Sequence, residues 1–331
     1  MSGAATLETG MPAGTFPAGP GAVGVLAAIG WAAAAAVTLG WPDLYGWHST
    51  AWLAWGEAGL AALLLGAAAA GDRLGRLSAR LRRAAPWLLV LAVVFALWEA
   101  AVAKFGWLPR PFFAPPQALL DAYIEDGAQL VECVVHSLGL LLTGIAIGMT
   151  AGFAVGIAIG WSGLAAYWIR PLLRLIGPVP ATAWLPIALF VFPTTFGASV
   201  FLIALSSGVP VAVLTWSGVA SVNRSFYDIA RTLGAGERFL IWKVAVPAAM
   251  PHVFVGAFMG LSYAFVVLMV AEMLGVKSGL GWYLQWAQGW AAYANMYAAL
   301  LIMVVLCSGM VTLLFLVRDR LLAWQKDLVK W

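Results

Sequence analysis

Few residues of this sequence have the types and spacing that catalysis or metal binding requires. The two cysteines, Cys133 and Cys307, are far apart and lack the spacing of metal ligands, so we expect reduced packing residues. The three histidines, His48, His136 and His252, suggest neither a zinc site nor a Ser-His-Asp arrangement. An intramembrane enzyme, which would need such a cluster, is therefore disfavoured. The chain also lacks the G-x-x-x-x-G-K-[ST] motif of an ATP-binding P-loop.

One segment instead concentrates charge in a sequence that is otherwise poor in it: "DIARTLGAGERFLIWKVAVP", residues 228–247. Ser225 followed by Asp228 has the spacing of a capping box, which predicts the start of a helix. Apolar or small residues then recur on one face of that helix at Phe226, Ile229, Ala230 and Leu233. By composition alone, such a helix would rest on lipid headgroups at the membrane interface.

Glycines divide this segment. Gly234 and Gly236 are expected to bend or break the first helix, because glycine adopts turn conformations readily. A second helical stretch, residues 237–245, is expected to end before Pro247. The segment therefore predicts a helix, a glycine turn and a second helix across one mouth of a helix bundle.

The composition places this segment in a membrane protein. Of 331 residues, 63% are hydrophobic and 10% are charged, whereas soluble domains have about a quarter charged residues. Several continuous apolar runs reach the roughly 20 residues that a helix needs to cross the hydrocarbon core, and they lack the alternation of a membrane β-strand. We therefore predict an all-α, polytopic membrane helix bundle. The net charge of +4 then reflects topology, and no nucleic-acid partner is expected.

Eight spans are expected, at residues 22–41, 51–71, 86–106, 132–160, 168–193, 197–218, 248–275 and 293–317. The fifth is interrupted by four prolines, Pro171, Pro178, Pro180 and Pro186. Residues 1–20 are rich in Gly, Pro, Ala and Thr and predict a disordered tail. No signal peptide is evident.

The basic residues set the expected orientation, because cytoplasmic loops are enriched in Lys and Arg. With a cytoplasmic start, one side of the membrane receives fifteen of the 18: Arg73, Arg76, Arg80, Arg82, Arg83, Arg170, Arg174, Arg224, Arg231, Arg238, Lys243, Arg318, Arg320, Lys326 and Lys330. The other side keeps Lys104, Arg110 and Lys277. Both termini are therefore expected to be cytoplasmic.

Small and polar residues inside the spans suggest packing and transport roles. Glycines recur every fourth residue in the fourth span and predict close helix packing within the bundle, at Gly144, Gly148, Gly152, Gly156 and Gly160. Gly256 and Gly260 have the same spacing in the seventh span and also predict close helix packing. The acidic residues Glu57, Glu99 and Glu272 lie toward the outer ends of their spans, where a buried charge is costly.

For Glu272 a structural hydrogen bond, or a role at the outer gate, is favoured over contact with cargo. No Lys or Arg is expected deep in a span, so an anionic cargo would meet hydroxyls, indole N–H groups or helix N-termini. The candidates for the translocation path are Thr182, Trp184, Ser206, Ser207, Thr215 and Glu272, each with packing as the competing interpretation.

The charged segment resembles the EAA loop of ABC-importer permeases, whose pattern is E-A-A, three residues, G, nine residues, I-x-L-P. Asp228, Ile229 and Ala230 stand at E-A-A, Gly234 at the glycine and residues 244–247 at the final four. Asp replaces Glu, Ile replaces the first Ala, and Val replaces both Ile and Leu. The flanking "LIGPVPATAWLPIALFVF", "LMVAEMLGVKSGLGWYL" and "LWEAAVAKFGWLPRPFFAPPQAL" are similar to the nitrate, sulfonate, taurine and bicarbonate branch of these permeases.

This resemblance spans about residues 86–325 and implies a type I ABC-importer permease core of six spans, in a bacterial inner membrane. Residues 21–85 would then hold two extra spans and a basic cytoplasmic loop, and 326–331 a carboxyl-terminal tail. The implied cargo is a small solute, such as nitrate, a sulfonate, taurine, bicarbonate or an organic acid.

The resemblance also implies that the loop at residues 224–247 docks on an ATPase and passes on its nucleotide-driven closure. The residues expected to act there are Asp228, Ala230, Gly234, Glu237, Arg238 and Pro247. Asp228 can pair with a cation, Ala230 permits close approach, and Gly234 sets the angle between the helices. The implied partners are two ATPase copies, which would carry ATP and Mg, an external solute-binding protein, a second copy of this chain and membrane lipid. No cofactor is expected on this chain. A secondary transporter, with its own ion coupling, is the alternative, and it would not need this loop.

Overall fold

The computed structural model describes residues 20–70 and 75–325, and within these ranges all regular structure is helical. The chain divides into two compact units, residues 1–125 (unit 1) and 126–331 (unit 2). The predicted tails, except Pro20, and part of the basic loop, including Arg73, lie outside the described residues. Unit 1 includes the third predicted span. The division at residues 85/86, which rests on the family resemblance, stays a prediction.

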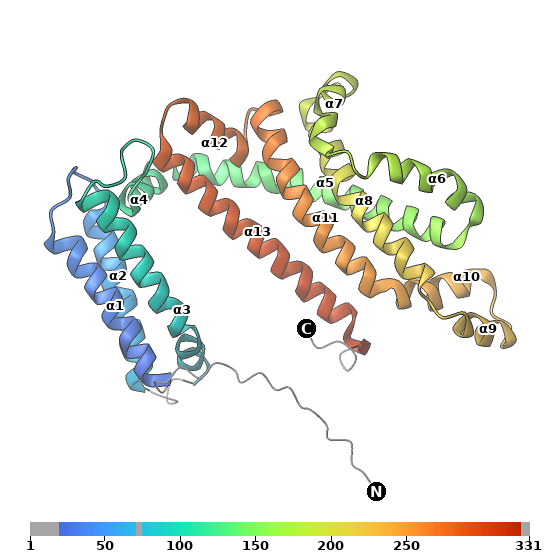
Figure 1. Ribbon diagram of the computed structural model, residues 1–331, viewed down its shortest axis with the longest axis horizontal. Helices are drawn as coiled ribbons and strands as arrows, with labels where there is room; N and C mark the ends of the chain where they lie inside the picture. Colours follow the sequence, from blue (N-terminus) through green and yellow to red (C-terminus); the bar gives the residue numbers. More distant parts are fainter. Residues whose placement is uncertain (1–19, 71–74, 326–331) are drawn as a thin grey trace, which may run out of the picture. The chain divides into compact units, whose positions relative to one another are not determined.

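The described residues of unit 1, 20–70 and 75–125, form four α-helices and a π-helical turn (Figure 1). These are α1 (Pro20–Gly40), α2 (Thr50–Ala70), α3 (Gly75–Glu99), the turn η1 (Ala100–Lys104) and α4 (Pro116–Glu125). Small and apolar residues of α1, α2 and α3 pack together around Trp31, whose indole N–H donates to the carbonyl of Leu88 at 3.0 Å. The indole of Trp98 donates to the carbonyl of Ala114 at 3.1 Å and ties the loop before α4 to α3.

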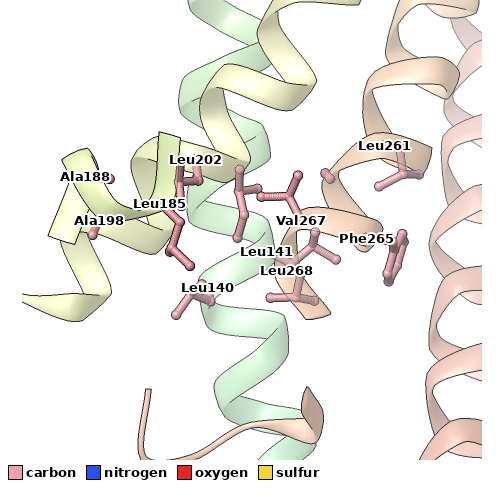
Figure 2. Packing of buried hydrophobic residues seen from close by; sticks show 12 residues of the cluster. Leu140, Leu141, Leu185, Ala188, Ala198, Leu202, Leu261, Phe265, Val267 and Leu268 are labelled. Carbon is pink, nitrogen blue, oxygen red and sulfur yellow. The ribbon is translucent and has the colours of Figure 1, made fainter. Parts of the chain in front are cut away.

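Unit 2 is built around α5 (Gly127–Trp161), α8 (Thr195–Ala220) and α11 (Val246–Gly275). Figure 1 also shows its other helices: α6 (Gly163–Ile176), α7 (Leu185–Val191), α9 (Arg224–Thr232), α10 (Glu237–Phe239), α12 (Leu280–Gly289) and α13 (Tyr293–Leu321). Shorter turns are η2 (Ala181–Trp184), η3 (Leu240–Ala245) and η4 (Ala323–Gln325). A core of leucines from α5, α7, α8 and α11 meets between these helices (Figure 2).

The described residues contain seven helices that are long and apolar enough to span a membrane, and eight if one sharply bent pair is a single span. The prediction of a polytopic helical membrane protein is therefore confirmed. The helices extend further than the apolar runs. The third begins at Gly75, inside the basic stretch, and the fourth at Gly127.

The fifth predicted span is the exception, because it is not one continuous helix. Its first part is α6, its second is η2 with α7, and the two parts are bent by 92°. Pro178 and Pro180 lie between them, outside any helix. Each proline lacks a backbone N–H and disfavours helical conformation in the residue before it, so two prolines in three residues break the helix.

The glycine stripe of α5 packs within unit 2, as predicted. A Cβ added to Gly148 would lie 2.7 Å from the Cα of Ala204, and one added to Gly152 would lie 3.0 Å from the carbonyl carbon of Gly208. On the other side of α8, a Cβ added to Gly260 would lie 2.6 Å from the carbonyl oxygen of Ser207. Lipid tails are as apolar as leucine, so membrane helices associate through this close packing and not through removal of apolar surface from water.

Candidate coupling segment and translocation cavity

The predicted helix–turn–helix between α8 and α11 is present, but its first helix is capped by a different residue. The side-chain oxygen of Asn223 accepts a hydrogen bond from the backbone N–H of Ser225 at 3.0 Å and makes Asn223 the N-cap of α9. The capping box assigned to Ser225 and Asp228 is therefore wrong. Ser225 is already inside the helix, and its hydroxyl donates to Asn223 at 2.8 Å. Asn is as good an N-cap as Ser, so the sequence allowed both starts.

Gly234 ends α9 with a positive φ of 85°. Its N–H donates to the carbonyl of Arg231 at 2.9 Å, and the N–H of Ala235 donates to the carbonyl of Ala230 at 3.0 Å. This is the left-handed conformation in which glycine commonly closes a helix, because other residues carry a Cβ that clashes there. The predicted turn is confirmed. Gly236, at φ −77°, has an ordinary extended backbone.

The second helix begins at Glu237, as predicted, but Pro247 does not end it. Helical structure runs from Glu237 through α10, the π-turn η3 and α11 as one 39-residue span. In η3 each N–H bonds one residue further back than in an α-helix. Pro247 follows this turn directly, and a local π adjustment of this kind lets a membrane helix continue past a proline. The charged segment is therefore mechanically continuous with the spanning helix α11.

One face of α9 is apolar and exposed. Phe226 is 60% exposed, Ile229 59% and Leu233 83%, and Ala230 lies beside them, half-buried. The spacing of these residues puts them on the face that the sequence predicted. A helix that leaves three large apolar side chains uncovered needs either a partner or lipid against that face.

The other face of α9 is anchored on unit 2 through Tyr227. Its ring packs edge-on against Trp161, the last residue of α5, with ring centroids 5.7 Å apart. Both rings border a small buried cluster of Val219, Ala245 and Ala249, which lie at the end of α8 and around the start of α11. α9 is thus linked to the ends of three spanning helices. Sequence reasoning missed this anchor, although an aromatic residue at the edge of an apolar face was a signal for it.

The charged residues of the segment form an exposed network. The Arg231 guanidinium lies 3.9 Å from the Asp228 carboxylate and 4.0 Å from that of Glu237, so it bridges the two short helices across the turn. Arg238 is exposed on α10. Exposed pairs of this kind contribute about 0–1 kcal/mol, so their main effect is to set the charge pattern that a partner would meet.

The predicted translocation residues separate into two groups. Thr182 of η2 and Ser206 of α8 line one cavity of about 320 Å³, whose walls also include residues 176–181 and Tyr263 of α11. The Ser206 hydroxyl donates to the carbonyl of Ile203 at 2.9 Å. Tyr263 was missed by sequence reasoning, although a tyrosine in the middle of an apolar span is a recognisable polar signal.

The remaining predicted residues of α8 and η2 serve packing. Ser207 is buried against Gly148 and donates to the carbonyl of Ile203 at 2.8 Å. Thr215 is buried against Gly156. Trp184 borders the leucine core. The Thr215 hydroxyl and the Trp184 indole N–H find no hydrogen-bond partner within residues 20–70 and 75–325.

Glu272 joins α11 to α5 and to the start of α12. Its carboxylate accepts hydrogen bonds from the Ser137 hydroxyl of α5 at 2.7 Å and from the backbone N–H of Gly281 at 2.8 Å. The Ser137 oxygen in turn accepts from the N–H of Leu280 at 2.9 Å. Glu272 is thus fully buried and bonded to two neighbouring elements, which is the structural hydrogen bonding expected of it.

A second polar link joins the start of α5 to α12 and α13. The Tyr283 hydroxyl donates to the Asp126 carboxylate, to which the Asn295 side chain also donates at 2.8 Å. Burial and the bonded Asp126 carboxylate hold the pKa of the Tyr283 hydroxyl well above its usual range. The phenol therefore stays protonated and remains a donor at any physiological pH.

Unit 1 buries a lysine at the end of a span. No Lys or Arg was expected deep in a span, and Lys104 is the last residue of the third spanning helix, but its side chain is fully buried. It forms an ion pair with Asp43 at 2.8 Å and lies 3.6 Å from Glu99. The sequence predicted Lys104 at the end of the 86–106 span, and nothing in it showed that the side chain would be covered.

Two kinds of comparison identify the class to which this arrangement belongs. The family described as "Binding-protein-dependent transport system inner membrane component" matches residues 144–327, more than half of the chain. The chain therefore belongs to this family of ABC-importer permeases, which are multi-span proteins of the inner membrane, and the resemblance inferred from the charged segment is confirmed.

Three curated relatives are similar over longer stretches. A "probable ABC transporter permease protein" of Brucella abortus is 32% identical over 198 residues, 60% of this chain and 79% of the relative. The nitrate import permease protein NrtB of Synechococcus elongatus is 25% identical over 253 residues, 74% and 89% of the two chains. The taurine transport system permease protein TauC of Escherichia coli is 28% identical over 248 residues, 73% and 87%.

Proposed function

We propose that this chain forms the translocation path of an ATP-driven importer for a small anion and couples it to a separate ATPase through residues 224–247. The observation that carries the proposal is the two-sided character of α9. Phe226, Ile229 and Leu233 expose an apolar face, while Tyr227 on the other side ties the helix to the ends of α5, α8 and α11. Force applied to the exposed face would thus reach three spanning helices.

The residues of the segment suit an ATPase surface better than lipid. Asp228, Arg231 and Glu237 place both signs of charge beside the apolar face, whereas an interfacial lipid-binding helix has a polar face rich in Lys and Arg. Alternating charges around an apolar centre are typical of a protein interface. ATP and Mg would bind to the ATPase subunit, and this chain would supply no residue to that site.

The anionic cargo is inferred from the named relatives, which import nitrate and taurine, and from the groups that this chain offers. Thr182, Ser206 and Tyr263 bring hydroxyls to the cavity of about 320 Å³. Arg170 and Arg174 line an open groove along α6. The last residue of that helix, Ile176, lines the cavity. The Arg170 guanidinium is held over the Trp216 ring at 4.4 Å. A cationic groove next to a hydroxyl-lined cavity favours a small anion over a cation.

The complete transporter is expected to contain two copies of this chain and two ATPases, with an external solute-binding protein, because one coupling loop per chain matches half of a two-fold assembly. Native mass measurement of the purified complex should give this two-to-two ratio. The chain alone should hydrolyse no ATP, and hydrolysis should appear with the ATPase. One copy of this chain beside a different permease would contradict the homodimer. Uptake into liposomes driven by an ion gradient without ATP would favour the secondary transporter.

Both termini are expected to be cytoplasmic, because the basic residues gather on one side. Single cysteines can test this at glycines with no described heavy atom within 4 Å of an added Cβ, in a chain with Cys133 and Cys307 replaced by alanine. An impermeant thiol reagent added from outside should label Gly46→Cys and Gly127→Cys. It should reach Gly163→Cys and Gly236→Cys only after the membrane is opened. Labelling of Gly236→Cys in sealed cells would invert the topology and remove the coupling loop from the ATPase side.

A further inference from the structure

Unit 1 buries a cluster of charges that the proposed transport function does not use. Glu57 of α2 is 3% exposed, Glu99 at the end of α3 is 0% exposed and Lys104 of η1 is 4% exposed. Thr38 of α1 and Gln117 of α4 are buried with them. Asp43, between α1 and α2, completes the cluster through its ion pair with Lys104. Buried charge is costly in a membrane, so each group must be compensated or neutral.

Lys104 compensates only one carboxylate fully. Its ammonium donates to the carbonyls of Thr38, at 3.1 Å, and of Trp41, and it lies 2.8 Å from the Asp43 carboxylate. The contact with Asp43 is an ion pair without hydrogen-bond geometry, since the Asp43 Oδ1 atom has no hydrogen-bond partner among the described residues. Glu99, at 3.6 Å, gains attraction from Lys104 but lies too far away for a hydrogen bond. The charged groups that act on Glu57 are Glu99 and Lys104, and those that act on Glu99 are Lys104 and Asp43.

The hydroxyl of Thr38 lies between the two remaining carboxyl groups. Its oxygen is 2.7 Å from Oε2 of Glu99, 2.9 Å from Oε2 of Glu57 and 3.0 Å from the carbonyl oxygen of Ala34. A hydroxyl has one hydrogen to donate. If both carboxyl groups were ionised, at least one of them would face the threonine oxygen at hydrogen-bond distance with no hydrogen between them. At least one carboxyl group must therefore carry a proton.

The hydrogen bonds around each carboxyl group indicate which of the two carries the proton. Glu99 accepts from the Gln117 side chain at 2.7 Å through Oε1 and lies near Lys104, so its charge is supported. Among the described residues Glu57 forms a hydrogen bond only with Thr38, and its other oxygen, Oε1, is buried without a hydrogen-bond partner. We propose that Glu57, Thr38 and Glu99 form a proton-binding site, in which the protonated Glu57 donates to Thr38 and Thr38 donates to the ionised Glu99.

This site would join the helices of unit 1 through a single exchangeable proton. The hydrogen-bonded series runs from α2 to α1 to the end of α3, and Gln117 extends it to α4. When Glu57 releases its proton to water, a second carboxylate is left beside Glu99 with one hydroxyl between them. The packing of unit 1 is therefore expected to weaken as the pH is raised. No other reaction partner is needed, because the step is the binding of one proton.

Infrared spectroscopy of the full-length protein in lipid nanodiscs tests this directly, since a carboxylic acid and a carboxylate have separate C–O stretching bands. At neutral pH, Glu57→Gln should remove one carboxylic-acid band from the spectrum. The matched control, Glu125→Gln at an exposed carboxylate of the same unit, should remove a carboxylate band instead. Loss of a carboxylate band in Glu57→Gln would overturn the assignment.

A second variant covers the case in which Glu57→Gln does not fold. Thr38→Val keeps the shape of the side chain and removes the hydroxyl, so the acid band of Glu57 should shift when its acceptor disappears. A spectrum with unchanged acid bands in Thr38→Val would overturn the site. Thermal unfolding gives an independent readout. The wild-type midpoint should fall as the pH is raised from about 4.3, where an unfolded glutamate loses its proton, towards neutral, with up to a tenfold loss in the folding equilibrium constant per pH unit. In Glu57→Gln the same fall should be smaller, and an equal fall in both would argue against a proton on Glu57.

Discussion

Replacing Gly152 with valine is expected to prevent α5 from packing on α8 and so to abolish folded protein. An added Cβ would lie 3.0 Å from the carbonyl carbon of Gly208 and closer still to its oxygen. Both are backbone atoms of a facing helix, so no side chain can turn aside. Overpacking usually costs about 1–3 kcal/mol, and the two further methyl carbons of valine should raise the cost above that range. The yield of monodisperse protein and its unfolding temperature in detergent measure the effect.

Gly139 provides the matched control on the same helix. It is exposed, and no described heavy atom lies within 4 Å of a Cβ built there. Valine is a slightly better helix former than glycine, so Gly139→Val should leave the unfolding temperature unchanged or raise it. Equal stability of Gly152→Val and Gly139→Val would show that α5 and α8 do not approach each other this closely in the membrane.

The glycine contacts show what a spacing rule can predict. Five glycines at intervals of four define a small-residue face on any α-helix, so the existence of a close packing face followed from the sequence. Its partner did not, because α8, with Ala204, Gly208 and Ala212, and α11, with Gly256 and Gly260, both carry small residues at the same interval of four. Which helix packs on the stripe depends on the whole bundle, and local periodicity contains no such information.

The positions of helix ends were predicted less well than the spans, for reasons of backbone chemistry. Pro247 reads as a helix stop, but the π-turn η3 before it shifts the hydrogen-bonding register and allows the helix to continue. Asn223 and Ser225 are both good N-caps, and only the three-dimensional path of the chain after α8 selects Asn223. The Gly234 turn was predicted correctly, because a positive φ is the one conformation that strongly selects glycine.

Among the candidate site residues, polarity alone did not separate cavity lining from packing. Ser206 and Ser207 are neighbours on α8, yet Ser206 lines the cavity and Ser207 packs against Gly148. Adjacent residues of a helix point about 100° apart, so which serine faces the cavity depends on how α8 is rotated between α5 and α11. That rotation is set by the glycine contacts, which link many residues distant in sequence.

Replacing Gly234 with valine is expected to uncouple ATP hydrolysis from transport while the membrane helices stay folded. At φ 85° a residue with a Cβ is strained by roughly 1–2 kcal/mol, and a β-branched side chain by more. The chain can relieve this strain only by changing the turn, which alters the angle between α9 and α10. Tyr227 and Trp161 would still hold α9 on unit 2, so insertion and assembly should be normal. Transport by the reconstituted complex, and its transport-stimulated ATPase activity, should fall sharply.

Gly236→Val separates the effect of the turn from the effect of size. Gly236 lies two residues away in the same loop, has an extended backbone that any residue adopts, and has no described heavy atom within 4 Å of an added Cβ. The same valine there should preserve most of the coupled ATPase activity. If α9 only rests on lipid, neither valine should affect transport, because lipid adapts to small changes of helix angle. Full transport by Gly234→Val would therefore support the lipid interpretation. Loss of transport in Gly234→Val, with transport retained in Gly236→Val, requires a partner whose binding depends on the angle between the two helices.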